Sequence, residues 1–89
     1  IRLPLFFMMF VVYVLYAQNF DKIYIGFTSD LQNRLIAHNQ MATKGWTIKF
    51  RPWSVIHTEY FNNKKMAMNR EKQLKSAQGR AFIRSIIKP

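Results

Sequence analysis

The sequence contains no cysteine and only four acidic residues, against 14 lysines and arginines in a chain of 89 residues. Without cysteine the chain has neither a disulfide framework nor a thiolate zinc site, which fits a reducing compartment and leads us to expect a cytoplasmic protein. So few carboxylates disfavour a site that holds two metal ions, because such sites normally need several of them. The chain also has no internal repeat and no low-complexity linker, so we expect one small domain with a single core.

The longest apolar run covers residues 3–16 and is interrupted by Pro4. It is too short to cross a bilayer as a helix, which takes about 20 residues. Arg2 before this run loosely imitates the start of a signal peptide, but no small-residue cleavage site follows. We therefore expect no stable membrane partner.

The formal net charge is +10, which is large for so small a chain. Such a charge favours a polyanionic partner, and nucleic acid is the leading candidate because the basic residues are spread over segments expected to fold. A basic protein without such a partner and a lipid-binding protein are the alternatives.

Two short segments near the start of the chain have the composition of strands. Residues 11–16 and 23–27 are rich in valine, isoleucine and tyrosine. Residues 17–22 between them hold turn-forming asparagine and aspartate, so the strands are expected to form an antiparallel hairpin. Ser29, with Gln32 three residues later, predicts a capping box at the start of a helix.

The second half of the chain adds one strand and two helices. Residues 53–60 (WSVIHTEY) are the predicted third strand, and residues 39–49 before it are predicted to be a loop. Asn63 and Ser76 each suit the cap of a helix, the first of which should end near Lys75. The predicted order is β-β-α-β-α-α, a small α/β (α+β) domain with a central three-stranded antiparallel sheet flanked by helices.

Each of the four carboxylates has a candidate role. Asp21 suits the hairpin turn, and Asp30 suits the positive end of the helix that follows it. Glu59 lies in the third strand, where a lysine is its expected surface partner. Glu71 is the remaining candidate ligand for a magnesium ion, whose shell water and phosphate would complete. From the residues alone, an ordinary helix-surface pair with Lys75, four residues later, is the preferred explanation of Glu71.

Arg34 and His38 lie four residues apart, beside the apolar side of the first predicted helix. A guanidinium group can contact two phosphate oxygens at once and keeps its charge at any working pH. The alternatives are an arginine whose stem covers the edge of the core, and a plain, partly buried histidine.

The tyrosines of the hairpin complete a recognisable pattern. Tyr13 is followed eleven positions later by Tyr24 in the triplet Tyr24-Ile25-Gly26, and Arg34 comes ten positions after Tyr24. This spacing resembles the GIY-YIG nuclease superfamily, with Val-Val-Tyr standing where that family has its first triplet. The resemblance is greatest to short single-domain members, similar to the N-terminal domain of excision-repair endonucleases. It assigns residues 9–89 to the nuclease-like domain and leaves residues 1–8 as an extension outside it.

The resemblance implies a DNA endonuclease, with DNA repair as its setting, that hydrolyses phosphodiester bonds with one divalent ion, Mg²⁺ or Mn²⁺. Its implied catalytic residues are Tyr13, Tyr24, Arg34, His38 and Glu71. Glu71 would hold the metal and Arg34 would neutralise the phosphate, while a tyrosine and His38 would activate water. Tyr13 is preferred as the base, with Tyr24 orienting water and phosphate, and the choice between them stays open. A phenol can be a base only if cations such as Arg34 favour the phenolate.

DNA is the expected partner, bound along a basic track beside the catalytic residues. The predicted track comprises Lys44, Lys49, Arg51, Lys64, Lys65, Lys72 and Lys75. Two alternatives stay open. The same fold can be a nucleic-acid-binding module without turnover, or an interaction module that self-associates through its apolar N-terminal extension.

Overall fold

The computed structural model describes residues 9–41 and 45–88, so the extension over residues 1–8 and Lys44 lie outside the described residues. The strands are β1 (Phe10–Ala17), β2 (Lys22–Thr28) and β3 (Ser54–Phe61). The helices are α1 (Leu31–Ile36), α2 (Lys64–Lys75) and α3 (Ala77–Ile87), with a π-helical turn η2 (Ala37–Met41) and a 3-10 helix η3 (Trp46–Phe50). The sheet is antiparallel with the order β2-β1-β3, which confirms the predicted β-β-α-β-α-α fold. No helix among the described residues is long and apolar enough to span a bilayer.

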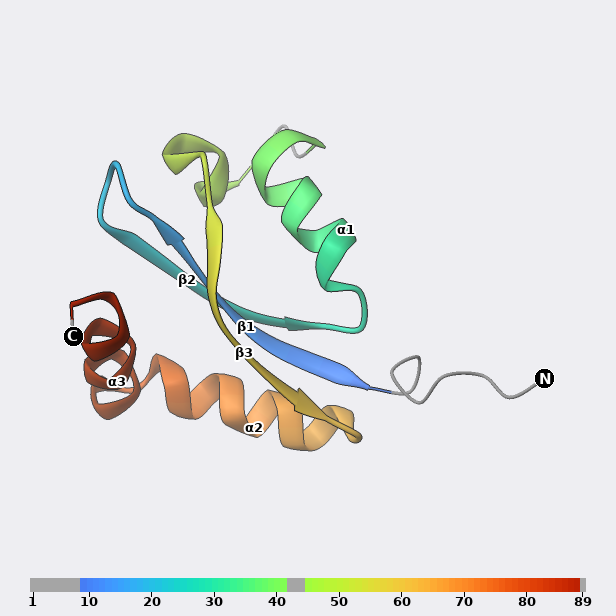
Figure 1. Cartoon of the computed structure of the whole chain (residues 1–89). Helices are drawn as coiled ribbons and strands as arrows, with labels where there is room; N and C mark the ends of the chain where they lie inside the picture. Colours follow the sequence, from blue (N-terminus) through green and yellow to red (C-terminus); the bar gives the residue numbers. More distant parts are fainter. Residues whose placement is uncertain (1–8, 42–44, 89) are drawn as a thin grey trace.

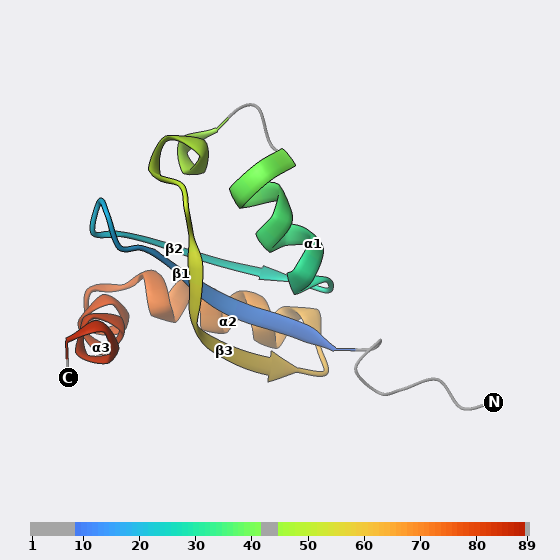
Figure 2. The same ribbon diagram turned by 45° about the horizontal axis from the view of Figure 1, so that its top comes forward.

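Strand β1 is the middle of the sheet because it is apolar toward both faces. Successive side chains of a strand point to opposite faces, so its alternate residues enter two separate layers. Val12 and Val14 face α2 and α3, whereas Tyr13 and Leu15 face α1 and η3. Figures 1 and 2 show these layers, with α1 on one side of the sheet and α2 and α3 on the other.

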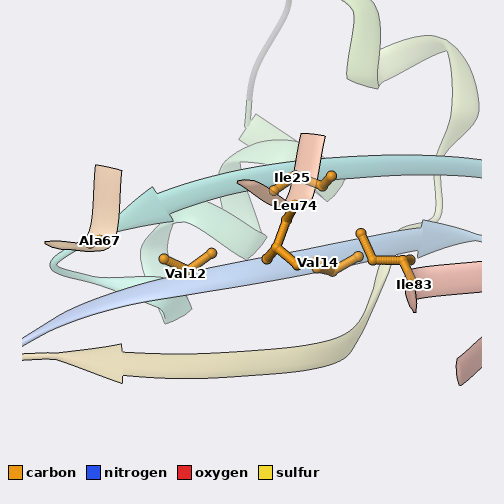
Figure 3. Close-up of a cluster of buried hydrophobic side chains, with 6 residues drawn as sticks. All are labelled: Val12, Val14, Ile25, Ala67, Leu74 and Ile83. Atoms are coloured by element: carbon orange, nitrogen blue, oxygen red, sulfur yellow. The ribbon is translucent and has the colours of Figure 1, made fainter. Parts of the chain in front are cut away.

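The α2 and α3 side of the sheet is an aliphatic core, drawn in Figure 3. Its buried members, from β1, β2 and the two helices, are Val12, Val14, Ile25, Ala67, Leu74 and Ile83. The two helices are capped as predicted: Asn63 accepts from the amides of Lys65 and Met66, and Ser76 accepts from the amide of Gly79. Packing of this side therefore follows from apolar periodicity and local caps.

The start of α1 differs from the predicted capping box at Ser29. Asp30 is the cap, and its carboxylate accepts from the backbone amide of Asn33 at 3.2 Å and from the Asn33 side chain at 2.7 Å. The amide of Asp30 in turn donates to the hydroxyl of Thr28 at 3.0 Å. A carboxylate so close to the positive end of the helix is a better acceptor than the serine hydroxyl, and it moves the start of the helix by one residue.

The segment predicted as a loop, residues 39–49, contains helical turns instead. The helix α1 continues into η2, and η3 follows after Gly45. The rings of Trp46 and Phe50, one turn apart, both pack against Trp53, whose indole N–H donates to the carbonyl of Thr47 at 2.8 Å. Tertiary packing around Trp53 thus stabilises turns that no local cap predicts.

Candidate active site

Tyr13 and Tyr24 meet on the α1 side of the sheet because of the register of the hairpin. Tyr13 pairs with Gly26 and Leu15 pairs with Tyr24, so the two tyrosines are diagonal neighbours on one face. Their ring centroids are 6.1 Å apart. Tyr13 is 0% exposed, whereas Tyr24 is only partly buried, so Tyr24 is the phenol nearer to solvent.

Gly26 leaves the space that the Tyr13 ring occupies. A Cβ atom at this position would lie 2.7 Å from Oη and 2.9 Å from Cζ of Tyr13. Its backbone is in the ordinary extended region, so space and not an unusual dihedral requires glycine here. Glycine is therefore needed at this position because an aromatic side chain approaches its backbone closely.

His38 is held between a phenol and a hydroxyl. Its Nε2 lies 3.2 Å from Oη of Tyr13, and its Nδ1 lies 3.2 Å from Oγ1 of Thr47. His38 and Thr47 are both buried, and the imidazole also packs against the Tyr24 ring with centroids 4.6 Å apart. In the tautomer that carries its proton on Nδ1, this N–H donates to Thr47 and Nε2 accepts from the Tyr13 O–H.

Arg34 extends from α1 so that its guanidinium lies beside both phenols and still reaches solvent. Burial raises the pKa of Tyr13 above its ordinary value, and this outweighs the opposing effect of the Arg34 cation. The pKa of His38 is lowered by burial and by the charges of Arg34 and Arg51. The resting pair is therefore a neutral phenol hydrogen-bonded to a neutral imidazole, because the Arg34 cation does not offset the effect of burial on Tyr13.

The structure brings four of the five predicted catalytic residues together and leaves the fifth apart. Tyr13, Tyr24, Arg34 and His38 contact one another on the α1 face, but Glu71 belongs to α2, on the other face. Its nearest charged partner is Lys75, with Oε1 and Nζ 3.5 Å apart. Among the described residues no hydrogen bond, ion pair or ring contact joins Glu71 to the other four.

The other three carboxylates are committed to structural contacts. Asp21 accepts from the hydroxyl of Tyr16 at 2.8 Å and from Arg84, and Asp30 caps α1. Glu59 was expected to pair with a lysine, but it pairs with Arg70 at 2.8 Å and with His57 at 2.7 Å. The Arg70 guanidinium holds the pKa of Glu59 below its usual value. Among the ion pairs of the described residues, that of Glu71 with Lys75 is the longest.

The residues of the predicted basic track lie on two sides of the sheet. Lys49 is exposed on η3, beside α1. The exposed lysines of α2 are Lys64, Lys65, Lys72 and Lys75. Arg51 turns inward, and its guanidinium donates to the carbonyls of Ala37 and His38. One continuous track would have to pass around an edge of the sheet.

Thr47 is the site residue that the sequence did not reveal. It lies nine positions after His38 in the segment predicted as a loop. Its carbonyl accepts from the Trp53 indole while its hydroxyl contacts His38. No sequence signal links a threonine to a histidine at this separation, because the link depends on how η3 packs.

Comparisons with known proteins find a matching family model and several relatives. The family model described as the GIY-YIG catalytic domain matches residues 9–83. A UPF0213 protein of Bacillus velezensis is 41% identical over 57 residues, which cover 64% of this chain and 58% of that protein. UPF0213 proteins of Halobacterium salinarum and Natronomonas pharaonis are 40% and 34% identical over 63 and 65 residues, covering 67% and 73% of this chain and 82% and 75% of theirs. The chain thus spans less than two thirds of the Bacillus relative and more of the other two.

Proposed function

This chain belongs to the GIY-YIG catalytic domain family, and from that premise we propose that it is a DNA endonuclease that uses one divalent metal ion to hydrolyse phosphodiester bonds. The observation that carries the proposal is the cluster of two phenols, an imidazole and a guanidinium around one buried hydrogen bond. The family indicates a nuclease, and the substrate, the metal ion and any role in repair are parts of the proposal.

The proton of the attacking water leaves through the tyrosines. Tyr24, the more exposed phenol, accepts a proton from the water as it gives its own proton to Tyr13, whose hydroxyl lies beside it. Tyr13 passes its proton to Nε2 of His38, which is neutral because its pKa is lowered. In this proposal Tyr24 takes the proton of the water because Tyr13 is buried, and Tyr13, the preferred base from the sequence, becomes the second member of the relay.

Arg34 supplies the positive charge that phosphodiester hydrolysis requires. Its guanidinium is fixed beside both phenols but remains partly in solvent, so it can contact two oxygens of the scissile phosphate. The charge that builds on the phosphate in the transition state strengthens this contact, which lowers the barrier.

A single Mg²⁺ or Mn²⁺ ion could be held by Glu71 together with water and substrate phosphate, without a site made of protein ligands alone. No group of three metal-ligating side chains exists among the described residues, and Mg²⁺ commonly uses one or two carboxylates with water and substrate phosphates. Glu71 would hold such an ion, which would offset the charge of the leaving oxygen. Strand β2 is an edge strand of the sheet, and both α1 and α2 pack against it.

The decisive experiment compares Glu71→Gln with Lys75→Gln. Purified protein is incubated with linear, nicked and branched DNA, with and without Mg²⁺ or Mn²⁺. If Glu71 holds the metal, Glu71→Gln abolishes metal-dependent cleavage and keeps the fold and DNA binding, while Lys75→Gln still cleaves. Full activity of Glu71→Gln would refute the assignment of the metal ligand.

One observation favours a second function, a nucleic-acid-binding module without turnover. Glu71 is paired with Lys75 and lies across the sheet from the tyrosine cluster. For such a module, the wild type binds DNA in a salt-dependent way but cleaves none of the DNA substrates with either metal.

A further inference from the structure

The helix η3 presents an indole ring to solvent. Trp46 is 47% exposed, yet its ring is fixed from beneath by Phe50 and Trp53, with centroid distances of 4.8 and 5.7 Å. Phe20, from the tip of the β1–β2 hairpin, is 48% exposed and packs edge-on against Phe50 at 5.5 Å. Two large aromatic surfaces are therefore held in place without being buried, although burial is what normally orders such rings.

These rings are connected to the catalytic cluster by direct contacts. Trp53 is 3% exposed and lies between the two, with its centroid 5.7 Å from that of Trp46 and 6.4 Å from that of Tyr24. Tyr24 in turn packs against His38. The buried ring of Trp53 thus lies between the exposed indole of Trp46 and Tyr24, the less buried of the two phenols.

Positive charge accompanies the exposed rings. The ammonium group of Lys22 lies over the Phe50 ring, 5.5 Å from its centroid, and Lys49 is exposed on η3 itself. Rings for bases beside amines for phosphates are the arrangement by which proteins hold single strands of nucleic acid. A second copy of the chain is disfavoured here because it would bring these lysines against like charges.

We propose that Trp46 and Phe20 form a stacking platform for unpaired nucleobases of a DNA strand whose neighbouring phosphate lies at the catalytic cluster. The position of that phosphate rests on the endonuclease function proposed above, whereas the binding of unpaired bases rests on η3 alone. The platform makes DNA with unpaired nucleotides beside the scissile bond the preferred substrate class, since a base inside a duplex has no free face to stack.

The test compares two single strands of equal length and charge, one of normal deoxynucleotides and one of abasic sites. Affinities are measured without a divalent ion, so no cleavage intervenes. One stacked base strengthens binding by about five- to hundredfold, and the wild type is expected to prefer the normal strand by this factor. Trp46→Ala lowers the ratio, Trp46→Ala combined with Phe20→Ala brings it close to one, and both variants keep the affinity for the abasic strand. Trp46→Phe keeps most of the preference, and so does Phe82→Ala, which removes a 43% exposed ring on α3.

Fluorescence gives a second readout, because Trp46 is exposed while the other tryptophan, Trp53, is buried. The normal strand should quench the emission of the wild type, and Trp46→Phe should remove most of that quenching. Equal affinity of the wild type for both strands, or an equal loss on both in Trp46→Ala, overturns the platform. Concentration-dependent dimers of the wild type that Trp46→Ala abolishes also overturn it, in favour of a second copy. Protein that prefers the normal strand but cleaves no DNA overturns the endonuclease proposal and leaves the platform standing.

Discussion

Val12 and Tyr13 are neighbours in the chain and are both 0% exposed, yet their surroundings have little in common. Val12 packs among aliphatic side chains from α2 and α3, where one apolar group can replace another of similar volume. Tyr13 packs among rings and makes a hydrogen bond to His38, which depends on Thr47 in turn. The first face stabilises the domain through volume alone, whereas the second also needs a partner for every polar atom it buries.

The second face meets that requirement. No buried side-chain nitrogen or oxygen among the described residues lacks a hydrogen-bond partner. An unpaired polar atom in such a place costs about 1–3 kcal/mol, so the network stabilises the fold only while it is complete. Apart from Glu71, the proposed metal ligand on α2, we therefore expect substitutions in the aliphatic core to affect stability and substitutions in the aromatic network to affect catalysis as well.

Tyr13→Phe should have the largest effect on catalysis. It removes the hydroxyl between Tyr24 and His38, so the cleavage rate should fall by about 10²–10⁴-fold, the usual contribution of a positioned base. Stability should fall by about 1–3 kcal/mol, because Nε2 of His38 loses its partner. Single-turnover cleavage and urea unfolding measure the two effects. A rate within a factor of three of the wild type would exclude Tyr13 from the proton path.

Leu74→Ala should have the converse effect. Leu74 is 0% exposed in the aliphatic core, and its truncation should lower the free energy of unfolding by about 2–5 kcal/mol. The cleavage rate of the protein that stays folded should match that of the wild type, because the tyrosine cluster lies across the sheet. Rates corrected for the folded fraction test this. A large loss of rate in fully folded Leu74→Ala would show that the two faces are coupled.

Gly26→Ala and Gly79→Ala form a matched pair, one on each face. The atoms nearest to a methyl group at Gly26 belong to the Tyr13 and Tyr24 rings, and displacing these rings should cost about 1–3 kcal/mol and reduce cleavage. A methyl group at Gly79 would overlap the backbone of Gln73 and Leu74, so it should destabilise the domain more than it slows the folded enzyme. Thermal melting and single-turnover rates are measured on both variants. A larger loss of cleavage in Gly79→Ala than in Gly26→Ala would contradict the prediction.

The pH dependence of stability should show the smallest effect. The pKa of His38 is lowered in the folded protein, so the unfolded chain binds its proton more readily. The contribution of His38 to the free energy of unfolding is complete above about pH 6.5, the ordinary pKa of histidine. It is lost as the pH falls through the pKa that His38 has in the folded protein. The lowered pKa values of Glu59 and Asp21 act with the same sign, but only below the ordinary values of 4.5 and 3.8 for these groups. The melting temperature of the wild type should therefore be lower at pH 5.5 than at pH 7.5, and this difference should be smaller in His38→Gln.

The aliphatic face could be predicted from the sequence, but much of the aromatic face could not. Asn63 and Ser76 signal their helices within a few residues, and the strands are marked by their composition. In contrast, η3 and the contact between Thr47 and His38 depend on packing around Trp53, which no local pattern records. The angle of Glu71 around its helix also says nothing about which face of the sheet that helix covers.

The central position of β1 has a consequence for synthesis on the ribosome. Its partner β2 emerges directly after it, but β3 begins at Ser54 and both helices of the aliphatic core follow later still. At about 5–20 residues per second, roughly 2–9 s pass before the second edge of β1 can be paired. During this interval the uncharged segment FVVYVLYA is a nascent hairpin strand with one open edge, the kind of segment that aggregates. The domain is thus most vulnerable while it is being made, and a chaperone that protects this segment should act before β3 appears.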